Sequence, residues 1–258
     1  MTEIQYPTAQ HRITVSRIEN YFRNQQHVDT VLLVNSLARE KGTHDSDIDM
    51  AILVKPEVGG QTFSQIENAW LDFQATDKLL NDYKSSGRFA HIHLDIIDGN
   101  FEQEEWEDGV DANFFEVEIG NRLLYSKPLS REGDHFKSLK AQWLPYYDSD
   151  LQTERLYQSK NAFRYEIEHI PVFINRQLYF QAYDRLNVAF RKFLQALFIK
   201  NKTYPISYNK WIKEQIVDIL GMPELYAALV SVFSINKLES NEIYERALIL
   251  ERLFDEYV

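Results

Sequence analysis

The sequence predicts an α+β protein in which a strand-bearing N-terminal half precedes an all-helical half. Two β-prone apolar runs, residues 31–34 and 50–54, are separated by a polar turn. A third run, residues 89–97, alternates between apolar and polar side chains, and from Glu132 onward the apolar residues recur at helical spacing. With 258 residues, 44% of them hydrophobic, the chain is long enough to bury two modest cores.

The elements of the N-terminal half are expected in a simple order. Residues 9–26 carry apolar side chains at helical spacing and lead directly into the first strand. A second helix is expected to begin near Thr62 and to run to about Lys84, before the third strand. Residues 114–125, with Gly120-Asn121 among them, predict a two-stranded hairpin.

The helical half is expected to form a separate bundle. A linker that begins at residue 126 places the predicted boundary between a first domain, residues 1–128, and a second domain, residues 129–258. The helices expected in or near the bundle lie around residues 136–144, 156–167, 179–199, 211–220, 223–233 and 241–257.

Two acidic residues stand at the start of the second strand. Side chains alternate along a strand, so Asp47 and Asp49 project to one face while Ile48 and Met50 project to the other. Two neighbouring carboxylates repel each other unless a cation lies between them, and Mg²⁺ prefers oxygen ligands. The pair therefore predicts a magnesium site, although a solvated polar turn between two core strands is the simpler alternative.

A further carboxylate lies on the next predicted strand. The alternation of residues 89–97 places His91, His93 and Asp95 on one face, so Asp95 is a carboxylate on a core strand. The alternative is that Asp95 begins the turn at Asp98-Gly99. The two histidines are expected to be partly exposed strand residues rather than metal ligands, because Mg²⁺ prefers oxygen to imidazole.

These residues carry a resemblance to a known family. Asn35-Ser-Leu-Ala-Arg39, followed by Ser46-Asp-Ile-Asp49, resembles the Gly-Ser-x-x-Arg-Gly … Ser-Asp-Ile-Asp signature of the nucleotidyltransferase superfamily, in particular its streptomycin-type aminoglycoside adenylyltransferases. The resemblance implies a nucleotidyltransferase-fold mixed sheet with flanking helices, in which the two aspartates and a third carboxylate, here Asp95, bind Mg²⁺. It also implies that Asn35, Ser36 and Arg39 contact the nucleoside triphosphate.

The sequence departs from the signature at two positions. Asn35 and Glu40 replace the two glycines, which in the family permit a left-handed backbone and close approach to a phosphate. Asn is the next most tolerant residue for that geometry.

The helical half extends the resemblance loosely. Residues 184–211 are similar to the helical part of streptomycin-type adenylyltransferases, in which basic residues and an acid near the ribose close over the nucleotide. On this basis the further candidate nucleotide contacts are Asp184, Arg185, Lys192 and Lys210. The alternative is that each is an ordinary solvated residue on a helix surface.

Composition limits the partners. The formal net charge of −11 argues against a nucleic-acid partner and suits a cationic acceptor. Residues 98–118 are densely acidic and could border a pocket for a polycation, or form a solvated face. The absence of cysteine, of an 18-residue apolar stretch and of a secretory signal leads us to expect a cytoplasmic protein with no membrane contact. The sequence does not indicate the oligomeric state.

Together, these features predict a Mg²⁺-dependent nucleotidyltransferase. We expect it to transfer AMP from ATP, its co-substrate, to a hydroxyl of a small cationic acceptor such as an aminoglycoside, as an antibiotic-resistance enzyme would. Asp95 is expected to accept the hydroxyl proton or to bind a second metal ion. Two alternatives stay open: a nucleotide-binding module that has lost turnover, and an enzyme that adenylylates a protein.

Overall fold

The chain folds into two compact units. The computed structural model describes residues 4–102, 114–145 and 147–258. The first unit holds Met1–Glu102 and Glu118–Leu144, and the second holds Gln103–Val117 and Pro145–Val258. The boundary predicted after residue 128 lies inside the first unit in this division.

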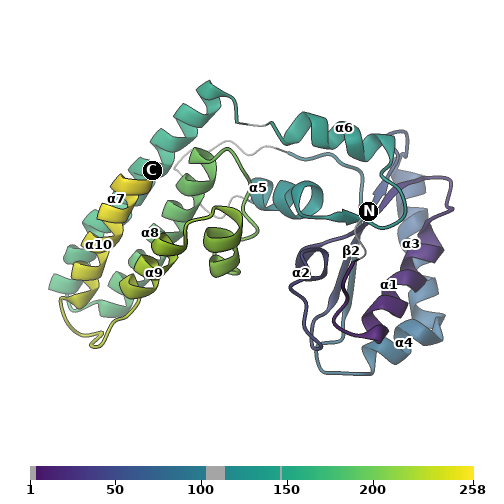
Figure 1. Cartoon of the computed structure of the whole chain (residues 1–258), viewed down its shortest axis with the longest axis horizontal. Helices are drawn as coiled ribbons and strands as arrows, with labels where there is room; N and C mark the ends of the chain where they lie inside the picture. The colour runs from purple at the N-terminus through teal and green to yellow at the C-terminus, as the bar shows by residue number, and fades with distance from the viewer. Residues whose placement is uncertain (1–3, 103–113, 146) are drawn as a thin grey trace. The chain divides into compact units, whose positions relative to one another are not determined.

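The first unit is built on a four-stranded mixed sheet (Figure 1). Its strands are β1 (Val28–Leu33), β2 (Ile48–Val54), β3 (Ile92–Ile97) and β4 (Lys127–Pro128), in the order β3-β2-β1-β4. β1 pairs antiparallel with both β2 and β4, whereas β2 and β3 run parallel. A mixed sheet followed by a helical part confirms the predicted α+β class.

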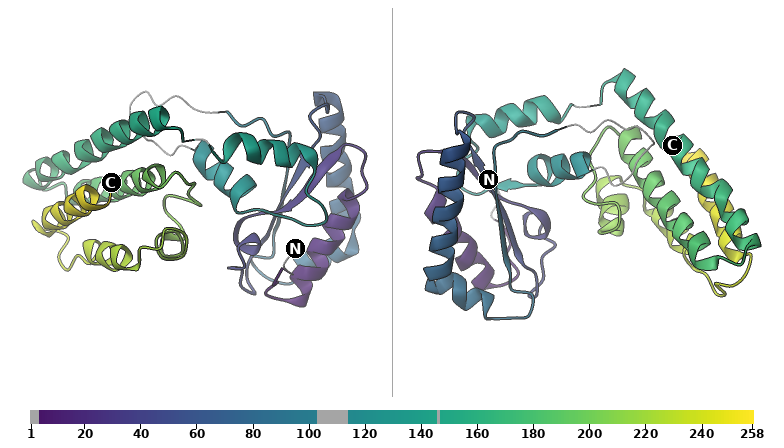
Figure 2. Two further views of the ribbon diagram at one scale, coloured as in Figure 1. Left: turned by 45° about the horizontal axis from the view of Figure 1, so that its top comes forward. Right: turned by 180° about the vertical axis from the view of Figure 1, so that it is seen from behind.

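Three helices cover one face of this sheet. They are α1 (Ala9–Phe22), α3 (Gly60–Thr76) and α4 (Lys78–Lys84), and both views of Figure 2 show them beside the strands. Ile48, Met50 and Ile52 of β2 point into this core and are almost completely buried. The other face of β2 is therefore the one that carries Asp49, as the alternation predicts.

Aromatic side chains join the helices of this layer to one another. Tyr21 of α1 stacks on Phe73 of α3 with ring centroids 4.0 Å apart, and Phe22 lies 5.4 Å from the ring of Trp70. Such pairs stabilise a core by about 0.5–1.5 kcal/mol beyond the area they bury.

The helix expected from Thr62 to Lys84 is interrupted at Asp77, whose extended backbone ends α3 and begins α4. The Asp77 carboxylate accepts hydrogen bonds from the backbone N–H of Leu80 and from the guanidinium of Arg17, at 3.1 Å and 2.7 Å. Partial burial raises the pKa of Asp77, but these hydrogen bonds outweigh burial and leave the pKa below its usual value. Asp77 is therefore a helix cap that also ties α4 to α1.

Asp77→Ala is expected to lower the free energy of unfolding by about 1–3 kcal/mol at neutral pH, through loss of the cap and of the charged hydrogen bonds. Because the folded-state pKa is depressed, this stability is present above the unfolded-state pKa of about 3.9 and is lost as the pH falls through the folded-state pKa. Denaturant titrations at neutral and acidic pH measure both effects. Asp82→Ala, which breaks the exposed pair with Lys78, is the matched control and should cost about 0.5 kcal/mol or less.

The hairpin predicted for residues 114–125 is wrong. These residues form α5 (Phe114–Ile119), which continues into a π-helical segment, η1 (Gly120–Leu124). Phe115, Ile119 and Leu123 are buried, and their spacing of four residues favours one apolar helical stripe over a strand pair. Gly120 therefore continues a helix instead of forming a turn.

The next helix, α6 (Asp134–Trp143), is attached to the sheet through Asp29 of β1. The buried Asp29 carboxylate accepts hydrogen bonds from the backbone N–H groups of His135 and Phe136, each at 3.1 Å. A carboxylate at a helix N-terminus is stabilised by the helix dipole. A polar side chain of β1 thus holds α6 in the first unit.

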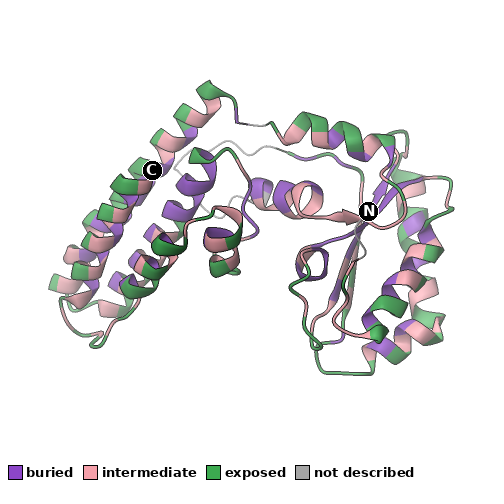
Figure 3. Cartoon of the chain, viewed as in Figure 1, coloured by how far each residue is buried: buried purple, intermediate pink, exposed green. Residues whose placement is uncertain are grey.

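The second unit is helical, as predicted. In addition to the first part of α5, it contains α7 (Ser149–Asn175), α8 (Tyr179–Lys200), η2 (Glu214–Ile219), α9 (Pro223–Val232) and α10 (Glu242–Tyr257). The segment expected to be helical over 211–220 is thus largely the short π-helical η2. The central helix is α8, whose C-terminal part is buried on all sides (Figure 3). Within the described part of the chain, no helix combines the length and the apolar character needed to cross a membrane.

Candidate metal and nucleotide site

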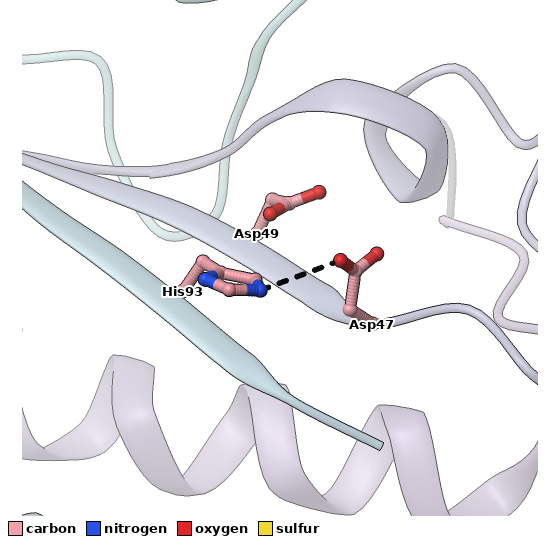
Figure 4. A group of neighbouring side chains, drawn as sticks. All are labelled: Asp47, Asp49 and His93. Atoms are coloured by element: carbon pink, nitrogen blue, oxygen red, sulfur yellow. Dashed lines mark ion pairs between the residues drawn. The ribbon is translucent and has the colours of Figure 1, made fainter. Parts of the chain in front are cut away.

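Asp47, Asp49 and His93 meet on the sheet face turned away from α1 and α3 (Figure 4). One ligand atom from each of the three side chains lies within 4.8 Å of the others, and His93 Nε2 is 3.5 Å from Asp47 Oδ2. Asp47 is half-exposed and His93 is exposed, so the group is open to solvent. Among the residues that the structure describes, no other set of three such side chains could hold one metal ion.

The parallel pairing of β2 and β3 produces this arrangement. Asp49 lies opposite His93 in the register, and the backbone N–H of Ile48 donates to the carbonyl of His91 at 2.9 Å. Because side chains of paired residues point to the same face, the imidazole stands next to the Asp49 carboxylate. Asp47 comes directly before β2 and reaches the same face from the strand's start.

Two buried side chains fix the backbone just before Asp47. The carbonyl oxygen of Ser46 accepts hydrogen bonds from His11 Nε2 of α1 and from the Tyr83 hydroxyl of α4, both at 2.9 Å. Burial, with Asp47 and Asp49 nearby, raises the pKa of Tyr83 to about 12, so this hydroxyl stays a donor at neutral pH. The start of β2 is therefore held from the helical side of the sheet.

The electrostatics of the group favour a bound cation. Burial raises the pKa of Asp49, and the neighbouring charge of Asp47 raises it further, while a hydrogen bond from Asn35 and the proximity of His93 act in the opposite direction. A cation between the two carboxylates would stabilise the charged form of Asp49, which burial and the Asp47 charge disfavour. The donor set of two carboxylates and one imidazole therefore fits a divalent metal ion.

Asp95 lies two residues further along β3, opposite Ala51, and its side chain is exposed. Its carboxylate accepts a hydrogen bond of 2.7 Å from Arg122 of η1. Arg122 is also 3.8 Å from Glu118, an acid whose pKa is raised chiefly by burial. Asp95 is thus on the predicted face, but it is paired with an arginine and lies outside the three-residue group.

The turn after β1 contains the residues expected to contact the nucleotide. Asn35 and Ser36 belong to the single-turn helix α2 (Asn35–Ala38), where Ser36 is buried, and the partly buried Arg39 follows it. Asn35 and Glu40 have φ angles of 55° and 59°. Both positions at which the signature has glycine therefore do adopt the left-handed backbone that glycine permits most easily.

Asn35→Gly is expected to preserve or improve nucleotide affinity, since glycine suits both the left-handed backbone and close approach to a phosphate. Asn35→Ala removes the same amide but keeps a side chain at positive φ, so it should be less stable than the glycine variant by about 1 kcal/mol. Calorimetric titration with nucleotide and denaturant unfolding of the three proteins compare both quantities. A large loss of affinity in both variants would mean that the Asn35 amide itself is needed, either at the nucleotide or at Asp49.

The remaining predicted nucleotide contacts lie in the second unit. Arg185 and Lys192 of α8 both face the buried carboxylate of Glu166 on α7, at 2.7 Å and 3.6 Å. Asp184 and Lys210 are exposed. The Glu166 carboxylate therefore offsets the positive charges of Arg185 and Lys192 within the helical unit.

The predicted acidic border of an acceptor pocket falls largely on residues 103–113, outside the described residues. Of its members that the structure describes, Glu116 is buried and accepts a hydrogen bond from the Tyr147 hydroxyl at 3.4 Å. Glu118 lies beside Arg122, and Glu102 is exposed.

Sequence reasoning missed two residues of the site. His93 was expected to be an ordinary strand residue, although the alternation already placed it on the face of Asp95. Its position opposite Asp49 depends on the β2–β3 register, which the sequence does not show. Arg122 lies in the segment for which a hairpin is predicted, but this segment is the π-helical η1. The sequence therefore does not indicate its contact with Asp95.

Part of the chain is similar to proteins of known family. Residues 16–97 match the family model described as "Polymerase beta, Nucleotidyltransferase", and this range spans β1, α2, β2 and β3. No match was found among curated proteins. A solved structure of a nucleotidyltransferase-like protein from Exiguobacterium sibiricum 255-15 is similar at 13% identity, over 96% of this chain and 75% of that chain, with a TM-score of 0.38. The family match supports the predicted superfamily, since residues 16–97 are similar to the nucleotidyltransferase domain that this model describes.

Proposed function

We propose that this protein transfers a nucleoside monophosphate, AMP from ATP, to a hydroxyl group of an acceptor. The observation that carries the proposal is the pair Asp47 and Asp49 at the start of a central strand, within the range that matches the nucleotidyltransferase model. A protein that only binds nucleotide has no need of two carboxylates whose charges disfavour each other. The pair therefore favours an enzyme over the alternative of a binding module.

Asp47 and Asp49 would hold a divalent metal ion, Mg²⁺ in the family that the sequence resembles. When bound there, such an ion would offset the negative charge of the triphosphate and of the leaving pyrophosphate. The fit rests on the donor set, on its exposure to solvent and on the raised pKa of Asp49.

The residues around the pair would position the reactants and accept the proton. Asp95 is the proposed proton acceptor, and a 2.7 Å hydrogen bond from the adjacent Arg122 guanidinium holds its carboxylate in place. Ser36 and Arg39 would contact the phosphates from the turn after β1. In this scheme the acceptor oxygen bonds to the α-phosphorus, pyrophosphate leaves with the electron pair of the broken bond, and the hydroxyl proton passes to Asp95.

The proposed acceptor is a small cationic molecule such as an aminoglycoside. The net charge of −11 and the acidic side chains near the site, including Glu118 and Asp98, support an acceptor of positive charge. Modification of a protein is the alternative that shares the same chemistry.

The experiment is incubation of the full chain with labelled nucleoside triphosphates and Mg²⁺ or Mn²⁺, together with aminoglycosides, lincosamides or proteins. Mass spectrometry then reads transfer of a nucleoside monophosphate. Transfer to a cationic small molecule is the expected result. Transfer only to protein would mean that the acceptor is a protein and not a small molecule. Nucleotide binding without transfer to any acceptor, under conditions in which both metals bind, would favour the binding module.

A further inference from the structure

We infer that His93 is a direct metal ligand, so that the site binds a first-row transition-metal ion in preference to Mg²⁺. This inference rests on the proposed function and adds to it the class of metal. His93 is not part of the signature. The inference gives it the role of third metal ligand, which the resemblance assigns to a carboxylate.

The geometry puts the imidazole among the carboxylates. His93 Nε2 lies 3.5 Å from Asp47 Oδ2, and ligand atoms of His93, Asp47 and Asp49 lie within 4.8 Å of one another. Figure 4 shows one ring nitrogen of His93 directed toward the Asp47 carboxylate, with the Asp49 side chain beside them. Metal–ligand bonds of about 2.0–2.2 Å place the ligands of one ion about 3–4 Å apart, so a single ion could contact all three side chains after small rotamer adjustments.

The expected third carboxylate is engaged elsewhere. Asp95 accepts a 2.7 Å hydrogen bond from Arg122, and it stands opposite Ala51 in the register, one pleat beyond the residue opposite Asp49. A carboxylate that binds a metal ion instead would give up this ion pair and leave a largely buried guanidinium beside the site. His93 needs no such exchange, because its ring already faces Asp47.

The chemistry of nitrogen determines the metal preference. Mg²⁺ is a hard ion that favours oxygen ligands and gives up water reluctantly, so an imidazole adds little to its affinity. First-row transition ions accept imidazole readily, and Mn²⁺ is the weakest-binding member of that series. A preference that is detectable with Mn²⁺ should therefore be larger for the later ions.

The test compares Mn²⁺ and Mg²⁺ binding to the full chain without nucleotide. Mn²⁺ affinity is measured by the EPR signal of the free ion, and Mg²⁺ affinity by competition. His93→Asp makes the site all-carboxylate and should lower the ratio of Mn²⁺ to Mg²⁺ affinity by about tenfold or more. Pulsed EPR of bound Mn²⁺ should show coupling to a directly bound nitrogen in the wild type and lose it in His93→Asp.

Two control variants separate His93 from its neighbours. His91→Gln removes the nearby imidazole, whose ring centroid is 6.1 Å from that of His93, and should leave both the ratio and the nitrogen coupling unchanged. Asp95→Asn should leave the ratio of Mn²⁺ to Mg²⁺ affinity and the nitrogen coupling unchanged, because Asp95 is not a ligand in this assignment and its charge acts on both ions alike. Circular dichroism verifies that each variant is folded.

Two results would overturn the inference while leaving the proposed function in place. One is an unchanged affinity ratio in folded His93→Asp while Asp47→Asn abolishes Mn²⁺ binding. The other is a fall in the ratio of Mn²⁺ to Mg²⁺ affinity in Asp95→Asn equal to that in His93→Asp. If the wild type bound neither metal, with or without nucleotide, both the inference and the proposed function would fail.

Discussion

Asp47→Asn and Asp49→Asn should each lower the rate of nucleotidyl transfer by about 10³-fold or more. A catalytic metal supplies several kcal/mol of transition-state stabilisation, and each 1.36 kcal/mol corresponds to a factor of ten in rate. Because Asp47 and Asp49 form the carboxylate pair of the site, an amide at either position removes an anionic metal ligand. Steady-state kinetics with the acceptor found in the panel, at saturating metal and nucleotide, measure the loss.

The same substitutions should leave the fold intact. The pKa of Asp49 is raised by burial and by Asp47, so its charge is unfavourable in the metal-free protein. Neutralising either acid should thus keep the metal-free stability equal to or slightly above that of the wild type in denaturant titrations. Unfolding of both variants would contradict this account of the site, and normal turnover by either would remove the pair from the mechanism.

Asp95→Asn is expected to lower kcat by about 10²-fold or more, since general-base contributions run from about 10² to 10⁴. Nucleotide affinity should barely change, because Asp95 belongs to β3 and not to the turn at Asn35 to Arg39, and its carboxylate accepts its hydrogen bond from Arg122. Steady-state kinetics give kcat, and calorimetry gives the dissociation constant of the nucleotide.

Arg122→Gln is the partner variant for this test. It breaks the ion pair but leaves the carboxylate, so it should reduce kcat less than Asp95→Asn does. Equal kcat in the wild type and Asp95→Asn would exclude Asp95 as the base. Matched losses of kcat and nucleotide affinity would indicate that Asp95 contributes to binding instead.

Local patterns in the sequence were sufficient for most elements of the fold. The alternation around Asp47 and along residues 89–97 predicted which side chains face the core, and the buried Ile48 and Met50 agree with it. Gly120-Asn121 misled because a turn dipeptide can also continue a helix when the flanking apolar residues repeat every four positions. The break between α3 and α4 at Asp77 was not predicted, although aspartate is a common helix-cap residue.

The site itself could be predicted only in part. Asp47 and Asp49 are two residues apart on one strand, so their proximity follows from strand geometry alone. The neighbours His93 and Arg122 come from other elements, at sequence separations that only strand register and helix packing determine. Whether Asp184, Arg185, Lys192 or Lys210 contacts nucleotide stays a prediction.

The hydrogen bonds to Ser46 have a consequence for heat inactivation. Its carbonyl oxygen accepts hydrogen bonds from His11 and from Tyr83, so the residue before Asp47 depends on α1 and on α4, a helix of only 7 residues, both on the far side of the sheet. Peripheral helices open locally at lower free-energy cost than central strands. Transient detachment of the shorter helix, α4, would remove the Tyr83 hydrogen bond while the strands remain paired, so catalytic activity should decline on warming several degrees before the sheet melts.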